Sequence, residues 1–214
     1  MQLSIITNKN SWFVKFGKEL QYNLEKLGHQ VSFVHFISDV KKGDICFILS
    51  FSKIVNELTL KKNINNIVVH ASDLPAGKGF SPMQWSVFEG NNHIILTLFE
   101  AIKEFDAGPY YLKDSVVFEG FELYEEMREI IGDKIVEMCL NYVNNRSQLV
   151  PKKQDGIESF YKKRSFVDDE IDPSKSIIEQ FNHFRIADNE NFPLYFFHGG
   201  KKYNLKIFRD NTDE

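Results

Sequence analysis

The sequence has few of the residues that mark metal-binding, secreted or membrane proteins. Of its 214 residues only two are cysteines, Cys46 and Cys139. Both lie in apolar segments, and neither belongs to a CxxC motif or a His-rich cluster, so we expect buried, reduced thiols rather than metal ligands. The apolar run at residues 3–6 is too short for a signal peptide, and no segment approaches the length of a membrane span. We therefore expect a cytoplasmic protein without a membrane partner.

The chain also lacks an excess of positive charge. It has 26 Lys and Arg against 30 Asp and Glu, which gives a net charge of -4. A protein that binds nucleic acid usually has an excess of Lys and Arg, so we expect no nucleic-acid partner and disfavour a tRNA substrate. Internal repeats and low-complexity segments are absent as well. The length suits one main domain with an appendage of about 60 residues.

Short apolar runs alternate with segments of helical periodicity through the first half of the chain. The runs predict buried strands at residues 3–6, 30–36, 44–49 and 67–69. Between them, apolar residues recur at helical spacing over residues 12–27, and a shorter helix is predicted at residues 53–60. Buried strands that alternate with helices predict an α/β fold with a mainly parallel sheet.

The second half continues this pattern up to residue 150. A helix led by Pro82 is followed by two strands joined by a turn, and then by a long amphipathic helix. These elements are predicted at residues 82–88, 93–99, 110–118 and 121–143.

Residues 150–156 are polar and break the periodicity, so we place a domain boundary there. The main domain takes residues 1–150, and a C-terminal α+β extension takes residues 151–214. The extension is predicted to hold a helix at residues 174–187 and a β-hairpin whose strands, 194–198 and 201–208, flank Gly199-Gly200. The exposed strand edge of the hairpin offers a surface for a second copy, which leaves a homodimer open.

Two polar residues stand where open α/β sheets place their ligands, at the ends of strands. His70 directly follows the strand at residues 67–69, and Asp106 lies in the turn FDAGP at residues 105–109. A lone His at a strand end is more often structural than catalytic, and Asp-Ala-Gly-Pro by itself is a good turn. Together, the two residues predict an imidazole and a carboxylate at one edge of the sheet, a pair that can do acid–base chemistry.

The residues around this pair carry a specific resemblance. Residues 70–85, HASDLPAGKGFSPMQW, are similar to a formyltransferase pattern of His, x, Ser, x, Leu-Pro, a Gly-bearing loop and a Pro-led helix with Trp. FDAGP is similar to the second motif of that family. The chain thus resembles the formyl-tetrahydrofolate-dependent formyltransferases, and the resemblance implies a Rossmann-like catalytic domain with N10-formyltetrahydrofolate as the formyl donor.

The tail of the chain extends this resemblance. It includes residues 161–164, 168–172 and 181–185, followed by Pro193. Together with the compact length, these segments are most similar to the sugar N-formyltransferases, including those that act on nucleotide-linked amino sugars of bacterial surface or flagellar glycans.

Formyl transfer to an amine develops negative charge on the carbonyl oxygen and positive charge on the nitrogen. His70 is the candidate donor to that oxygen, a role worth about 2.7–4 kcal/mol for a good donor. Asp106 is the candidate carboxylate that holds the imidazole in its tautomer, favours its protonated form and helps to collect the proton from the nitrogen. Neither role needs a metal, and the sequence has no credible cluster of metal ligands.

The resemblance implies an Asn-His-Asp triad, and this chain departs from it at the Asn. The position two residues before His70 is Val68, which cannot donate a hydrogen bond. A second donor to the oxyanion must then come from a backbone N–H group or a water, or activity is weak or lost. The nearby side chains that could replace the Asn are Ser50, Ser52 and Ser72.

The resemblance also implies that the pterin of the donor lies near the loop at residues 49–53 and near the Asp106 turn. The candidate cofactor-binding residues are Ser50, Phe51, Ser52 and Gly108. Phe51 is equally suited to filling the core.

Three further residues are candidate contacts of the acceptor substrate. Ser72 follows His70 closely, although it is also a good turn residue. Lys78 lies in a Gly-rich loop where a cation could meet a phosphate, although a solvated surface lysine is more common. Arg185 shares a helix face with Asn182, and it could reach a phosphate or sugar or could only tie the tail to the main domain.

The leading hypothesis is an enzyme that moves a formyl group to the amino group of a nucleotide-activated amino sugar. Methionyl-tRNA formyltransferase shares the motifs, but it would need a basic surface for RNA. A third hypothesis is a folate- or nucleotide-sugar-binding relative with weak or no turnover, motivated by Val68.

Overall fold

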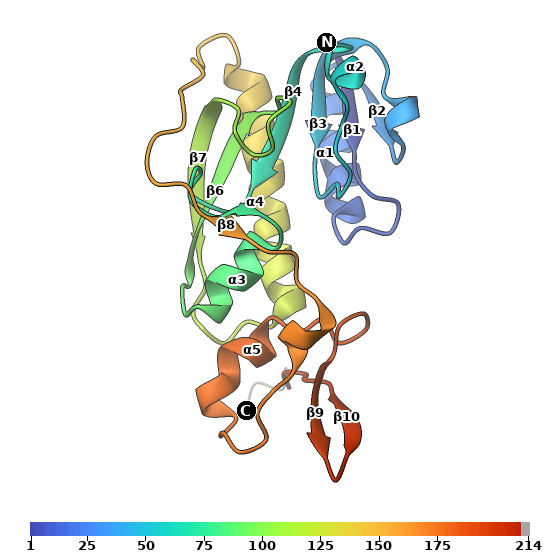
Figure 1. The fold of residues 1–214 in the computed structure, drawn as a ribbon. Helices are drawn as coiled ribbons and strands as arrows, with labels where there is room; N and C mark the ends of the chain where they lie inside the picture. Colours follow the sequence, from blue (N-terminus) through green and yellow to red (C-terminus); the bar gives the residue numbers. More distant parts are fainter. Residues whose placement is uncertain (211–214) are drawn as a thin grey trace.

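The computed structural model describes residues 1–210, and its centre is a six-stranded sheet (Figure 1). The strands are β1 (Gln2–Ile6), β2 (Gln30–Val34), β3 (Gly43–Ile48), β4 (Asn63–His70), β6 (His93–Glu100) and β7 (Tyr110–Val117). They lie in the order β2-β1-β3-β4-β6-β7. Strands β1 to β4 run parallel, and β6 runs antiparallel to its neighbours β4 and β7. The predicted α/β fold with a mainly parallel sheet is confirmed.

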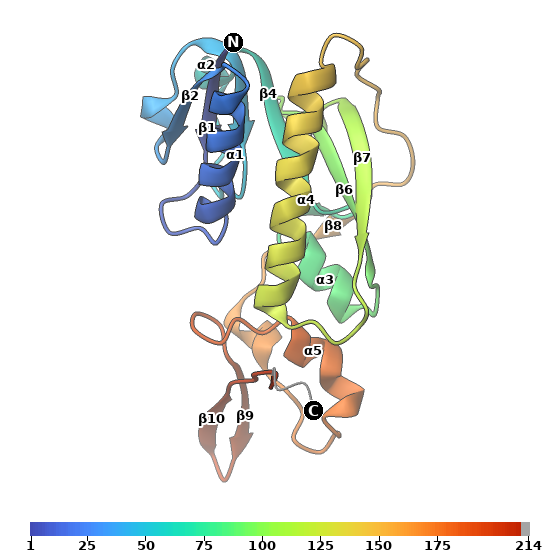
Figure 2. The same ribbon diagram turned by 180° about the vertical axis from the view of Figure 1, so that it is seen from behind.

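Two long helices, α1 (Val14–Lys26) and α4 (Tyr124–Asn145), lie side by side on one face of this sheet (Figure 2). The main apolar core lies between them and the strands. The helices approach closely at Gly132, where a Cβ atom would lie 2.4 Å from the ring of Phe16. The opposite face of the sheet carries a smaller apolar cluster formed by Ile6, Val40, Cys46 and Ile48. None of the helices within residues 1–210 is long and apolar enough to cross a membrane.

The two cysteines are buried and unpaired, as predicted. Burial raises the pKa of Cys46 to about 12 and also raises the pKa of Cys139. Both thiols therefore stay protonated at neutral pH, and they behave as small apolar side chains.

The short elements differ from the predictions where polar side chains bond to the local backbone. Helix α2 (Glu57–Leu60) begins only after Asn56, whose side chain accepts a hydrogen bond from the Thr59 N–H, whereas α3 (Pro82–Phe88) has the predicted bounds. A 3-10 turn, η1 (Ile37–Asp39), precedes β3. The helix predicted at residues 174–187 is wrong in its first part, because Ser174 and Ser176 bond to carboxylates in tight turns. Only η3 (Ile178–Gln180) and α5 (Phe181–Arg185) are helical there.

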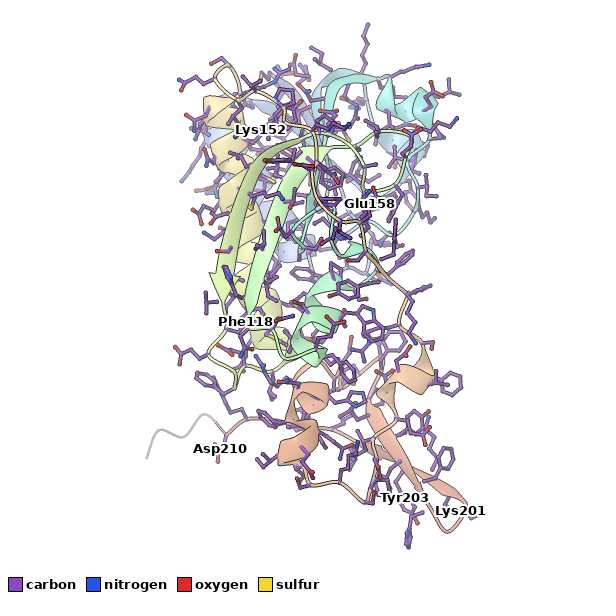
Figure 3. The ribbon with its side chains drawn as sticks, turned by 60° about the vertical axis from the view of Figure 1, so that its left-hand side comes forward. Phe118, Lys152, Glu158, Lys201, Tyr203 and Asp210 are labelled. Carbon is purple, nitrogen blue, oxygen red and sulfur yellow. The ribbon has the colours of Figure 1, made fainter. Side chains whose placement is uncertain are left out.

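After α4 the chain returns over the edge of the sheet as an extended segment, residues 152–162, which we call the strap. Figure 3 shows it between the labelled Lys152 and Glu158. Lys152 forms a β-bridge with Tyr110 at the start of β7. Farther along, β8 (Phe160–Tyr161) pairs in parallel with β5 (Lys78–Gly79), which lies in the loop after β4. Two-residue strands leave no periodic signal, and so this pair was not predicted.

Residues 166–210 form the remainder of the extension around their own apolar cluster of Ile171, Phe184, Ala187 and Leu194. Their elements are η2 (Phe166–Asp169), η3, α5 and a β-hairpin of β9 (Leu194–His198) and β10 (Lys201–Leu205). The hairpin is confirmed, and it projects away from the sheet with Lys201 and Tyr203 toward its far end (Figure 3). The division at residue 150 stays a prediction, since the strap lies on the main unit.

Candidate active site

A cavity of about 460 Å³ opens where β3 and β4 end. Its walls come from the loops that follow β1, β3 and β4, from the loop between β6 and β7, and from the first half of α4. His70 and Asp106 both line it. The structure therefore brings the two residues of the predicted catalytic pair together at one site, although they are 36 positions apart in the sequence.

His70 is the last residue of β4, and its side chain is mostly buried. Its Nε2 atom lies 2.9 Å from the carbonyl oxygen of Gly77. A carbonyl only accepts, so Nε2 carries a proton in this arrangement. The Asp106 carboxylate was expected to hold the imidazole tautomer, but its Oδ2 atom is 3.9 Å from Nε2, too far for a hydrogen bond. The Gly77 carbonyl orients the ring instead, and Asp106 is close enough to stabilise a protonated imidazole.

Asp106 lies in a tight turn that folds back against the end of β6. Its φ angle is 51°, in the left-handed region, and its buried carboxylate accepts a hydrogen bond from the Gly79 N–H at 3.0 Å. A Cβ atom on Gly108 would lie 1.7 Å from the carbonyl oxygen of Glu100, so no side chain fits at that position. Gly108 does not line the cavity, and its role in cofactor binding stays a prediction.

The loop after His70 is anchored by a residue that the sequence analysis missed. Thr97 is fully buried in β6, where its hydroxyl donates to the carbonyl of Ser72 at 2.7 Å and accepts from the Leu74 N–H at 3.3 Å. A single Thr inside an otherwise apolar strand is the only sequence signal of this role. Gln154 of the strap, which contacts the Asp106 turn, was also missed. It lies among other polar residues, so nothing in the sequence distinguishes it from a solvent-exposed side chain.

Val68 lines the cavity and packs against the smaller apolar cluster, on the face of the sheet opposite α1 and α4. Ser50 and Ser52, two of the three candidates to replace the missing Asn, line the same cavity. The Asn8 side chain lies beside them and donates to the Ser52 hydroxyl at 3.1 Å. The third candidate, Ser72, does not line the cavity, and its buried hydroxyl has no partner in residues 1–210.

The loop after β3 supplies the other predicted cofactor contacts. Ser50, Phe51 and Ser52 all line the cavity, and Ser50 has a left-handed φ of 47°. Phe51 also packs against the apolar cluster on that face, so it lines the cavity and extends the core at once.

The structure places Lys78 and Arg185, two predicted substrate contacts, outside the cavity. Lys78 is 3% exposed, pairs with Glu158 of the strap and lies outside the cavity. Arg185 is 1% exposed and donates to the backbone carbonyl of Glu122 and to the side chain of Asn92. Both cations therefore hold later segments of the chain onto the main unit, and neither lines the cavity.

A different cation lines the cavity at its α4 end. Arg128 packs over the ring of Tyr124 at 3.9 Å and donates to the Tyr124 hydroxyl at 2.8 Å. Burial raises the pKa of Tyr124, so its phenol stays neutral. The Nε atom of Arg128 is buried without a partner in residues 1–210. This end of the cavity therefore combines an aromatic ring with a guanidinium group whose other nitrogens pair with Glu125 and the Tyr124 hydroxyl.

The sheet order and the placement of the site at its strand ends give this chain the fold of the formyltransferases. The structure of a methionyl-tRNA formyltransferase from Clostridium thermocellum matches with a TM-score of 0.80 at 19% identity, over 100% of this chain and 95% of that chain. A likely sugar N-formyltransferase from Mycobacterium tuberculosis matches with a TM-score of 0.75 at 13% identity, over 100% and 99%. HypX from Aquifex aeolicus in complex with tetrahydrofolic acid matches with a TM-score of 0.81 at 17% identity, over 97% and 37%.

The relatives found by sequence are matched over a smaller share of their length. The methionyl-tRNA formyltransferase of Thermosipho melanesiensis is 30% identical over 148 residues, which are 69% of this chain and 48% of that protein. The methionyl-tRNA formyltransferase of Mesoplasma florum is 25% identical over 158 residues, 70% of this chain and 50% of that protein. The chain thus spans about half the length of the curated relatives it matches. No protein-family model matches it.

Proposed function

We propose that this chain is an N-formyltransferase that moves a formyl group from N10-formyltetrahydrofolate to the amino group of a nucleotide-activated amino sugar. The observation that carries the proposal is the His70–Asp106 pair in the wall of the cavity, in a fold shared with formyltransferases. The catalytic roles of both residues belong to the proposal.

In this proposal the protonated imidazole of His70 stabilises the oxygen of the formyl group. Its Nε2–H group is directed to the Gly77 carbonyl, and Nδ1 has no hydrogen-bond partner in residues 1–210. Nδ1–H is thus the donor available for the developing oxyanion. The Asp106 carboxylate stabilises the positive charge of the ring and helps to take up the proton that the amine loses.

The cavity suits a folate donor in size and in lining. Its volume of about 460 Å³ lies in the usual range of small-molecule sites, about 300–1,000 Å³. Apolar side chains of Ile48, Phe51 and Ile102 line it beside two irregular loops, whose backbone groups could bond to the edge of a pterin. When bound there, N10-formyltetrahydrofolate supplies the formyl group. Ser50, Phe51 and Ser52 are the residues that we propose hold it.

The sugar acceptor is supported by charge. With a net charge of -4 the chain has no overall excess of positive charge for tRNA, and the likely sugar N-formyltransferase from Mycobacterium tuberculosis shares the fold over 100% of this chain and 99% of that chain. Methionyl-tRNA is the second candidate acceptor, because the curated relatives named above are methionyl-tRNA formyltransferases.

An acceptor panel tests the proposal directly. The protein is incubated with N10-formyltetrahydrofolate and either nucleotide-linked amino sugars or methionyl-tRNA, and products are identified by the mass of one added formyl group. We expect turnover with at least one amino sugar and none with methionyl-tRNA. Transfer to methionyl-tRNA alone would favour the second candidate. No product with any acceptor, while folate binding is measurable by calorimetry, would favour a binding protein without turnover.

Val68→Asn is expected to raise kcat, by up to about tenfold, because it restores a side-chain donor two residues before His70. It also places an amide in an apolar cluster, so unfolding free energy should fall by about 1–3 kcal/mol. Val68→Ala is the matched control, since it makes room without adding a donor. A lower kcat in Val68→Asn, with Val68→Ala unchanged, would show that the cavity is adapted to valine.

A further inference from the structure

The strap, residues 152–162, contacts both halves of the proposed site without lining the cavity. One of its contacts reaches the turn that carries Asp106, and another reaches the loop that orients His70. Figure 3 shows the strap crossing the edge of the sheet between Lys152 and Glu158. Its first residue is itself anchored, because Lys152 and Tyr110 exchange two backbone hydrogen bonds of 2.8 Å.

Gln154 makes the contact with the Asp106 turn. Its side-chain Nε2 donates to the carbonyl oxygen of Asp106 at 3.0 Å and to that of Gly108 at 2.8 Å. Its Oε1 atom is buried and has no partner in residues 1–210. The carbonyl oxygens of Asp106 and Gly108 can only accept hydrogen bonds. If the amide were reversed, Oε1 would face both of them and no hydrogen bond would form. The chemistry of the turn therefore defines which way this amide points.

The turn is held from both sides. Asp106 has a φ of 51°, in the left-handed region that Asp adopts more readily than most residues with a side chain. On one side of the turn, Gly108 lies against the backbone carbonyl of Glu100. On the other side, Gln154 bonds to the carbonyl oxygens of Asp106 and Gly108. In this conformation the Asp106 carboxylate reaches the Gly79 N–H and lies 3.9 Å from His70.

The same strap also holds the loop that orients His70. The Ser159 hydroxyl accepts from the Gly77 N–H at 2.8 Å, and the Ser159 carbonyl accepts from the Lys78 N–H at 2.9 Å. Gly77 in turn presents the carbonyl that receives the Nε2–H of His70. One segment thus sets the positions of both members of the pair.

We infer that Gln154 is a positioning residue of this site, and that it sets the approach of Asp106 to His70 by bonding the Asp106 turn to the strap. It touches neither the cavity nor the reacting atoms, so it acts through Asp106. The kinetic part of this inference rests on the proposed function, and the positional part rests on the hydrogen bonds alone.

Gln154→Met tests the inference, because it removes both donors with little change in side-chain volume. We expect kcat to fall about 10- to 100-fold, as a displaced catalytic group predicts, while KM for donor and acceptor stays within about threefold. Hydrogen exchange at the Gly79 amide should become about tenfold faster, since its Asp106 acceptor is no longer held. Gln148→Met is the matched control, an exposed glutamine in the turn that follows α4, and both readouts should stay at wild-type values.

The exchange measurement keeps the inference separate from the proposed function. If the wild-type protein transfers no formyl group to any acceptor, faster Gly79 exchange in Gln154→Met still supports the positioning role. A folded Gln154→Met protein with unchanged Gly79 exchange would overturn it, as would unchanged kcat in an active enzyme. If Gln154→Met does not fold, Ser159→Ala at an exposed position serves instead. It should lower kcat about 3- to 10-fold and speed exchange at Gly77, and the absence of both effects would overturn the shared role of the strap.

Discussion

Replacement of His70 by Ala is expected to lower kcat for formyl transfer by a factor of about 10²–10³, the usual cost of removing one donor to an oxyanion. The ring lines the cavity, and its Nδ1 atom is the one nitrogen without a partner in the described chain. Folding should change little, because the bond lost to the Gly77 carbonyl lies at the cavity wall. Single-turnover rates with the preferred acceptor, together with circular dichroism, measure the two quantities separately.

Asp106 offers a way to separate charge from position in the same experiment. Asp106→Ala removes the charge near His70 and the acceptor of the Gly79 N–H together, and should lower kcat by about 10²-fold or more. Asp106→Asn retains an oxygen that can accept from Gly79 but loses the charge. A loss in Asp106→Asn as large as that in Asp106→Ala, with a pH profile shifted from that of wild type, would identify stabilisation of the imidazolium as the role of the carboxylate. A smaller loss in Asp106→Asn would assign the remainder to the hydrogen bond with the Gly79 N–H.

The control for these variants is His93→Ala, an exposed histidine at the start of β6 that lies outside the cavity. It should turn over at the wild-type rate. Near-normal turnover in His70→Ala or Asp106→Ala would show that the site is assigned to the wrong residues.

Arg185→Ala is expected to destabilise the fold by about 3–5 kcal/mol, the usual cost of removing one partner of a buried ion pair. Arg185 is 1% exposed, and its guanidinium lies 3.4 Å from the Glu122 carboxylate. Burial works against the charge on Glu122, but the N–H groups of Glu119 and Gly120 and the Arg185 charge outweigh it and hold the pKa of Glu122 below its usual value. Without the arginine, a buried charge loses its counterion, and the link between the extension and the main unit is lost.

Urea unfolding measures this loss, and Arg209→Ala is its matched control. Arg209 pairs with Glu126 at a more exposed site, 43% and 32% of the two side chains being accessible, so its removal should cost less than about 1 kcal/mol. Arg185→Met combined with Glu122→Gln should recover part of the stability, because it removes the unpaired charge. Equal effects of Arg185→Ala and Arg209→Ala would contradict the structural role of Arg185.

The local patterns of the sequence were sufficient wherever neighbours in the chain decide the structure. Apolar segments predicted the four parallel strands, since strands inside a sheet that is covered on both faces need few polar residues. The edge strand β2 was predicted to be buried but is only half-buried, because it has a neighbour on one side alone. Pro82 marked the first residue of α3 correctly. The prediction at residues 174–187 was wrong in its first part because Ser174 bonds to Asp172 in a turn and Ser176 caps the helical turn that follows it. Apolar spacing does not report either bond.

By itself, the sequence determined the fold class and the two residues that carry the proposed chemistry, because apolar periodicity and the motifs around His70 and Asp106 are local. Only the tertiary structure decided that Gly77 orients the imidazole, that Lys78 and Arg185 are buried ties, and that Gln154 bonds to the Asp106 turn. The residues of these contacts are far apart in the chain, 48 positions for Gln154 and Asp106 and 82 for Gly77 and Ser159. Such contacts form only when the tertiary fold brings distant segments together. In the sequence, a polar residue that makes one cannot be distinguished from a solvent-exposed polar residue.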